Sequence, residues 1–135
     1  MTGETNLSTL LRTLRPALHE EAFGFFSLAE PVALPLLPEA RGSFREDEGL
    51  TLILPLDSAA AQGLPPEAPW ALVTLTVHSS LEAVGLLAAI SAALATAGIS
   101  LNAVSACYHD HLFVPWDRRL EALDILDGLA GKPPS

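Results

Sequence analysis

The chain has 135 residues, of which half are apolar and 17% are charged, the composition of a globular protein and not of a disordered one. A chain of this length buries roughly two thirds of its unfolded surface, so its core needs no disulfide or metal to hold it. Seven basic and sixteen acidic residues give a net charge of −9 without any dense cluster of Lys and Arg, which argues against nucleic acids and anionic membranes as partners.

Two local features indicate the compartment. The chain has a single cysteine, Cys107, so no internal disulfide can form, and its apolar surroundings predict a packed, structural thiol. The first 21 residues contain no apolar run of the kind found in secretion signals. We therefore expect a cytoplasmic protein.

The first half of the chain predicts short elements separated by proline and glycine. Three prolines between residues 29 and 40 make a full helix there unfavourable. A helix at the start of the chain is expected to cover the sheet face that a full helix at 29–40 would otherwise cover. The predicted elements are a helix at 6–14, a strand at 20–28, a hairpin of 41–47 with 49–55 that turns at Gly49, and a short helix at 57–62.

The second half predicts longer elements. Asp117 is expected to cap the last helix, with Leu120, Leu123 and Leu126 on its apolar face. The predicted elements are a strand at 70–77, a helix at 82–97, strands at 101–108 and 111–115 joined by a tight turn, and a helix at 117–129.

The stretch 83–111 has no charged side chain before Asp110 and is long enough to be tested as a membrane span. Its apolar bulk is mostly alanine, polar residues recur through it, and no Lys or Arg lies close to either end. The helical spacing of its apolar residues also stops at Gly98, which fits a left-handed helix cap. The stretch is therefore interpreted as a helix, a cap and a strand.

The elements of the second half follow the order β-α-β-β-α, which is typical of an α+β fold with helices on one face of an antiparallel sheet. Residues 50–57 align with residues 110–117 at an offset of sixty, matching Pro55 to Pro115 and Asp57 to Asp117. This internal repeat predicts two related units, at residues 1–65 and 66–135, the first of them abbreviated.

The segment TVHSSLEAVGLLAAISAALATAGISLNAVSACYHDHLFVP, residues 76–115, resembles the ACT domain, a regulatory module of amino-acid metabolism. The likeness is greatest to the paired ACT units of aspartate kinases and of arginine sensors. It implies two ferredoxin-like (βαββαβ) units, a role in sensing an amino acid or similar metabolite, and no enzymatic activity. We also expect no cofactor, and we expect a homodimer because the predicted fold has exposed sheet edges and a helix face of small residues.

In this family the ligand usually lies where two units meet, against the loop between the first strand and the first helix. A helix start offers unpaired N–H groups to a carboxylate, Glu82 suits an amino group, and Gly85 inside a helix implies a close approach. The candidate ligand residues are His78, Ser79, Ser80, Glu82, Val84, Gly85 and Leu86, with Asn102 and Ser105 on the adjoining strand.

Other interpretations of these residues stay open. Ser79 and Ser80 equally suit helix caps, with Ser79 and Glu82 forming a capping box. His109 and His111 share one side of an extended segment with Cys107, and Asp110 between them adds an oxygen, so metal binding is a remote alternative. The chain contains no GxSxG elbow and no phosphate-binding glycine loop.

A second functional alternative is an interaction module that dimerises without a ligand. Exposed sheet edges and a helix flank of small residues favour self-association. The small residues are Ala88, Ala92 and Ala95.

Overall fold

The computed structural model describes residues 6–76 and 85–131, and these form two compact units. The smaller unit comprises residues 21–70, and the larger unit comprises the described residues before and after them. Residues 6–20 therefore pack with the second half of the chain. Within the described ranges, no helix is both long and apolar enough to cross a membrane.

The larger unit is built on a sheet in the order β1-β4-β6-β5. The first residues of β1 belong to this unit, and β5 pairs antiparallel with β6, placing Asn102 opposite Phe113 and Ser105 opposite Asp110. β5 is an edge strand, and all four of its residues are exposed. The strands are β1 (Pro16–Leu28), β4 (Trp70–Leu75), β5 (Asn102–Ser105) and β6 (Asp110–Pro115).

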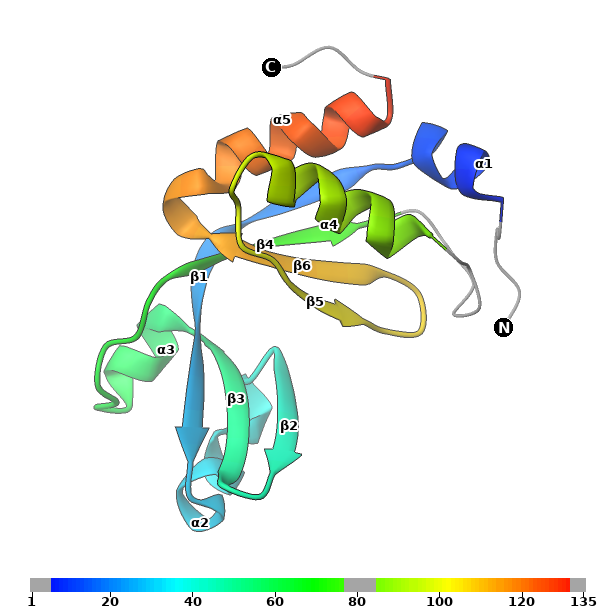
Figure 1. The fold of residues 1–135 in the computed structure, drawn as a ribbon. Coiled ribbons are helices and arrows are strands. Elements are labelled where there is room, and N and C mark those ends of the chain that lie inside the picture. The colour runs from blue at the N-terminus through cyan, green and yellow to red at the C-terminus, as the bar shows by residue number, and fades with distance from the viewer. Residues whose placement is uncertain (1–5, 77–84, 132–135) are drawn as a thin grey trace. The chain divides into compact units, whose positions relative to one another are not determined.

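Helices cover one face of this sheet, as Figure 1 shows. They are α1 (Leu7–Arg12), α4 (Leu86–Thr96), the 3-10 turn η2 (Trp116–Arg118) and α5 (Arg119–Leu129). Their apolar residues recur at spacings of three and four and meet every second residue of β4 and β6 in one core. Its fully buried members include Leu10, Leu14, Val73, Leu75, Ile90, Leu94, Leu112, Val114 and Leu126.

α4 ends as its sequence predicts. Gly98 has φ +72, its N–H donates to the Ala95 carbonyl, and the Ile99 N–H donates to the Leu94 carbonyl, both at 2.9 Å. This pair of hydrogen bonds is the Schellman motif. The predicted change from helix to cap at Gly98 is confirmed.

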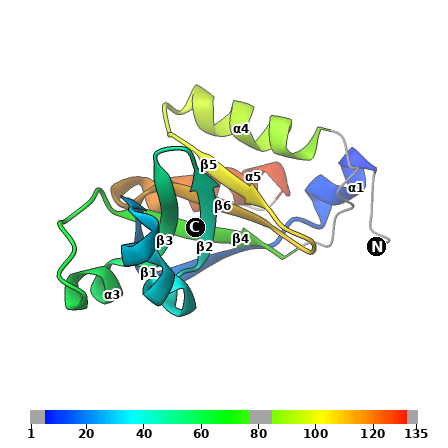
Figure 2. The ribbon, with the colours of Figure 1, turned by 90° about the horizontal axis from the view of Figure 1, so that it is seen from below.

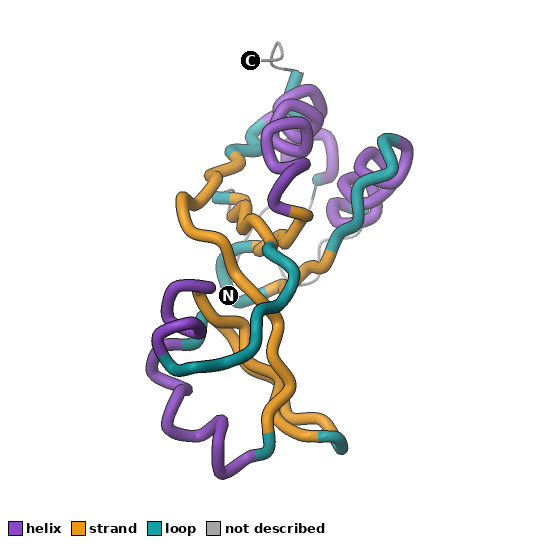
Figure 3. The backbone as a smooth tube through the Cα atoms, turned by 90° about the vertical axis from the view of Figure 1, so that its left-hand side faces the viewer, coloured by secondary structure: helices purple, strands orange, loops and turns teal. Residues whose placement is uncertain are grey.

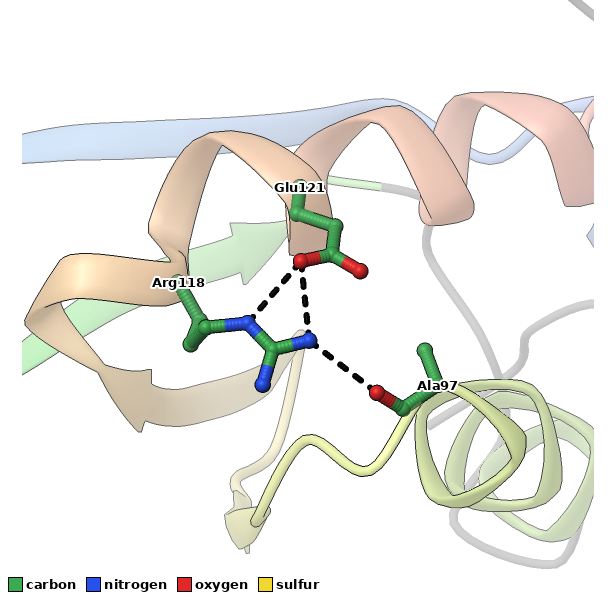
Figure 4. A network of polar contacts seen from close by, with 3 residues as sticks. All are labelled: Ala97, Arg118 and Glu121. Atoms are coloured by element: carbon green, nitrogen blue, oxygen red, sulfur yellow. Dashed lines mark hydrogen bonds and ion pairs between the residues drawn. The ribbon is translucent and has the colours of Figure 1, made fainter.

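Arg118 ties the end of α4 to the start of α5 (Figure 4). Its guanidinium donates to the Ala97 carbonyl at 3.0 Å and pairs with the Glu121 carboxylate at 2.8 Å. The contact places a cation at the negative end of the α4 dipole, where positive charge is stabilising. The two helices are therefore joined by a polar contact as well as by the core.

The smaller unit has the strand order β1-β3-β2, with both pairings antiparallel. Its elements are the later part of β1, α2 (Glu30–Ala33), the 3-10 helix η1 (Leu34–Glu39), β2 (Gly42–Glu46), β3 (Gly49–Pro55) and α3 (Leu56–Ala61). The prolines of segment 29–40 limit it to one helical turn and a 3-10 helix, as expected. Figure 3 shows the helices on one side of the strands, over a core that includes Phe26, Leu52, Leu54 and Ala59.

The internal repeat is visible in the backbone. Pro55 has φ −55° and ψ 136°, Pro115 has φ −53° and ψ 136°, and each ends a strand and precedes a helix. The two repeats also share a strand order: β1 lies beside β3 and β3 beside β2 in the first, and β4 lies beside β6 and β6 beside β5 in the second. The α+β class, with antiparallel sheets and ferredoxin-like units, is therefore confirmed.

Three expectations about the helices are wrong. α1 does not cover the abbreviated unit, because Leu10 and Leu14 are buried in the core of the larger unit. Asp117 does not cap α5; it lies inside η2, and the residue before α5 is Arg118, which makes no capping hydrogen bond. Leu120 is 63% exposed, because the buried face of α5 runs through Ala122 and Leu126 instead.

Candidate functional site

The structure describes four of the nine predicted ligand residues. Gly85 and Leu86 lie at the start of α4, and Asn102 and Ser105 lie on β5. The remaining five fall outside the described residues, and so does the predicted capping box; they are His78, Ser79, Ser80, Glu82 and Val84.

Gly85 is the residue before α4 and not, as expected, a residue inside the helix. Its φ is +95, a conformation that glycine adopts without strain, so backbone geometry by itself accounts for a glycine here. The first turn of α4 contains no acidic side chain, and Gly85 provides no side-chain cap. The N–H groups of this turn and the positive end of the helix dipole are therefore not matched by a carboxylate of the helix itself.

The side chains of the first turn divide between core and surface. Leu86 is 3% exposed and packs with Ile90 and Leu94, so it can offer a ligand only its backbone. Leu87 is 37% exposed. Leu87 is therefore the position from which the surface at the start of α4 can be altered without disturbing the core.

Leu7 on α1 borders the same place. Figure 2 shows α1 beside the start of α4. A Cβ built on Gly85 would lie 3.3 Å from Leu7 Cδ2. The close approach expected at Gly85 is made by this side chain. No signal in the sequence links residues 7 and 85, because the contact is formed only by packing in the larger unit.

Asn102 and Ser105 lie on opposite faces of the sheet. Ser105 is opposite Asp110 and its hydroxyl donates to that carboxylate at 2.5 Å, while Asn102 is opposite Phe113 on the other face. Both side chains are exposed. The hydroxyl of Ser105 is therefore engaged within its own hairpin, and the two residues do not converge on one point.

A polar cluster that the sequence did not reveal lies on the face of this sheet away from the helices. Thr74 on β4 is 8% exposed, and its Oγ1 lies 2.8 Å from His19 Nε2 on β1 and 3.0 Å from His111 Nδ1 on β6. A hydroxyl has one proton to donate, so at least one of the two imidazoles donates an N–H to Thr74. The cluster links three neighbouring strands through side chains.

The turn between β5 and β6 differs from its prediction. Cys107 is exposed and not packed, because β5 ends at Ser105 and the Ala106 N–H closes the turn on the His109 carbonyl at 3.0 Å. The rings of His109 and His111 meet edge to face with centroids 6.3 Å apart. Across the described ranges, no three His, Cys, Asp or Glu side chains gather in a way that could hold a metal ion.

Comparison with known proteins identifies the family of the chain. Two family models, both described as ACT domain, match residues 2–71 and 67–127. A solved structure of a protein of unknown function from Vibrio cholerae, described as a possible transport protein, is 41% identical, with a TM-score of 0.82. The match covers 92% of this chain and 95% of that one. No curated protein matches the chain.

More distant structures share the fold. A protein from Agobacterium tumefaciens is 20% identical with a TM-score of 0.69, over 87% of this chain and 89% of that one. The regulatory subunit of aspartate kinase from Thermus flavus is 12% identical with a TM-score of 0.62, over 86% of this chain and 95% of that one. The resemblance found in the sequence is confirmed, and the chain belongs to the ACT domain family, with two ACT units in tandem.

Proposed function

We propose that this protein is a non-enzymatic regulatory module that binds a free amino acid or a similar small metabolite at the start of α4 and signals its presence to a partner. Membership of the ACT family and the likeness to a regulatory subunit of aspartate kinase support a regulatory role. We further propose that the protein acts in the cytoplasm and that the two repeats in the sequence correspond to residues 1–65 and 66–135, with residues 6–20 of the first repeat packing in the larger unit.

The observation behind the proposed site is that neither Gly85 nor the first turn of α4 supplies a side chain that caps this helix. Gly85 leads into the helix with φ +95 and adds no side-chain cap, and the first turn has no acidic residue. A ligand carboxylate placed there would accept hydrogen bonds from the N–H groups of the first turn, which have no acceptor within the helix, and gain from the helix dipole. The candidate residues named from the sequence remain the proposed ligand set, with Ser79, Ser80 and Glu82 as side-chain contacts. Asn102 and Ser105 lie on opposite faces of the sheet, so only one of them can reach a single ligand.

Leu7 provides an apolar surface beside the proposed site. Its side chain lies against Gly85 and is 36% exposed, so part of it remains open to a bound molecule. A ligand with an apolar side chain would bury this surface and gain about 25 cal/mol for each Å² removed from water. We therefore propose that the ligand is an apolar amino acid rather than a charged one.

A screen of the twenty amino acids by thermal shift tests the proposal. A ligand at one hundred times its dissociation constant stabilises the folded protein by about 2.7 kcal/mol. At least one amino acid is expected to raise the unfolding midpoint, and its amide or its decarboxylated amine is expected to raise it much less. A screen in which no amino acid raises the midpoint would contradict the proposal.

The second candidate function is a dimerisation module without a ligand. Its support is the exposure of all of β5 and of the small residues Ala88, Ala92 and Ala95 on α4. Exposed edge strands pair readily with a second chain. Light scattering at high micromolar concentration is expected to give the mass of a dimer, and Val104→Lys on β5 is expected to weaken that dimer. A strict monomer would remove this candidate.

A further inference from the structure

The smaller unit contains a surface groove that is separate from the start of α4. Its volume is about 270 Å³, slightly below the roughly 300 to 1,000 Å³ of pockets that hold drug-sized molecules. It is lined by Phe26, Leu56, Asp57, Ala59, Ala60, Leu64, Pro65, Pro66 and Glu67. A groove of this size suits one small molecule.

The walls of the groove are held in place by the end of α3. Gly63 has φ +76 and its N–H donates to the Ala60 carbonyl at 3.0 Å, while the Leu64 N–H donates to the Ala59 carbonyl at 3.1 Å. This Schellman motif turns the chain back so that the residues after α3 line the groove. Pro65 and Pro66 follow in this wall, and the backbone there is restricted because each proline ring fixes its φ. A preformed wall reduces the entropy that a ligand must overcome on binding.

The chemistry of the lining is apolar with two carboxylates. Most of the lining side chains are aliphatic or aromatic, and Asp57 and Glu67 are its only charged residues. Within the part of the chain that the structure describes, neither carboxylate forms an ion pair or hydrogen bond to a side chain. The net charge of −9 adds a further attraction for cations.

We propose that this groove binds a small organic amine, with the apolar body of the amine against Phe26, Leu56 and Leu64 and its ammonium group between Asp57 and Glu67. Charge complementarity selects the cation, because a carboxylic acid of the same shape would meet two like charges and a neutral molecule would gain nothing from them. This site is independent of the proposed amino-acid site, which requires a ligand carboxylate.

Binding is tested by NMR titration of the whole protein with 2-phenylethylamine, using 2-phenylethanol as the neutral probe of similar shape. The amine is expected to shift the backbone amide signals of Ala60 and Leu64 in the millimolar range, and the alcohol is expected to bind more weakly. Asp57→Asn and Glu67→Gln should each weaken amine binding about two- to fivefold, the range for partly exposed ion pairs. Asp47→Asn, a carboxylate in the turn between β2 and β3, should leave it unchanged.

Two alanines of α3 provide a matched steric control. Ala60 lines the groove and Ala61 does not, and both are exposed. Ala60→Phe is expected to abolish the amine-dependent shifts, and Ala61→Phe is expected to retain them. Equal binding of amine and alcohol, unchanged binding in both charge variants, or no shift at these amides would overturn the proposal. If Ala60→Phe does not fold, the weakened amine binding expected of Asp57→Asn and Glu67→Gln still tests the proposal.

Discussion

Leu7 and Gly85, which are 78 positions apart in the sequence, lie against each other where α1 meets the start of α4. A Cβ on Gly85 would be 3.3 Å from Leu7 Cδ2, and Gly85 itself has φ +95. The backbone conformation is what favours glycine at this position, and the side chain of Leu7 would have to shift slightly to admit a Cβ. The same contact places α1, which precedes every strand in the chain, at the edge of the proposed ligand site.

Gly85→Ala is expected to destabilise the protein by about 1–2 kcal/mol, because an L-residue is strained in the left-handed region. Gly128→Ala is the matched control. Gly128 lies in α5, and a Cβ there meets nothing within 4 Å, so alanine should stabilise the protein by about 0.5–1 kcal/mol. Urea denaturation measures the change in unfolding free energy for both variants. An equal effect of the two substitutions would contradict the left-handed backbone conformation of Gly85.

Arg118→Gln is expected to lower stability by about 1 kcal/mol, because it weakens the hydrogen bond to Ala97 and removes the ion pair with Glu121. Arg45→Gln removes an arginine from an exposed pair with Glu30, whose hydrogen bond and charge raise the pKa of Arg45. Because solvent screens that pair, its loss should change stability less. Thermal denaturation of the two variants tests this order, and a larger loss for Arg45→Gln would contradict it.

Thr74→Val is expected to destabilise the protein by about 1–2 kcal/mol, because it removes the hydroxyl between His19 and His111 while keeping the shape of the side chain. Thr76→Val is the comparison on the same segment of chain. The Thr76 hydroxyl donates to the Arg15 carbonyl but is exposed, so water can replace it and the loss should be smaller. Equal losses in denaturant unfolding would show that the buried cluster contributes little.

The local elements of the fold could be predicted from the sequence because their signals are local. The helix, cap and strand around Gly98 follow from spacing and a glycine, and the prolines of 29–40 exclude a full helix. The repeat at Pro55 and Pro115 could be found because both units use the same proline at the same junction. Each of these features is decided within a few residues.

The errors concern packing between distant segments. α1 has an apolar stripe that suits either unit, and only the fold shows that Leu10 packs in the larger one. Cys107 follows an apolar strand, but β5 is an edge strand whose residues are exposed, and alternation alone does not distinguish an edge from a centre. The contacts of Thr74 with His19 and His111 join three strands and have no local signature.

Binding of an amino acid at the start of α4 is tested by titrating the amino acid that gives the largest thermal shift into wild type, Leu87→Gln and Leu87→Glu. Both substitutions remove the same exposed side chain, and only one adds a negative charge to the first turn of α4. That charge should stabilise the free protein by about 0.3–1 kcal/mol through the helix dipole, so weaker binding cannot be attributed to unfolding.

Isothermal titration calorimetry is the measurement. Binding to Leu87→Glu is expected to be roughly two- to fivefold weaker than binding to Leu87→Gln, because its carboxylate repels that of the ligand. Equal affinity of Leu87→Glu and Leu87→Gln, or the absence of any amino acid that binds wild type, would contradict the account.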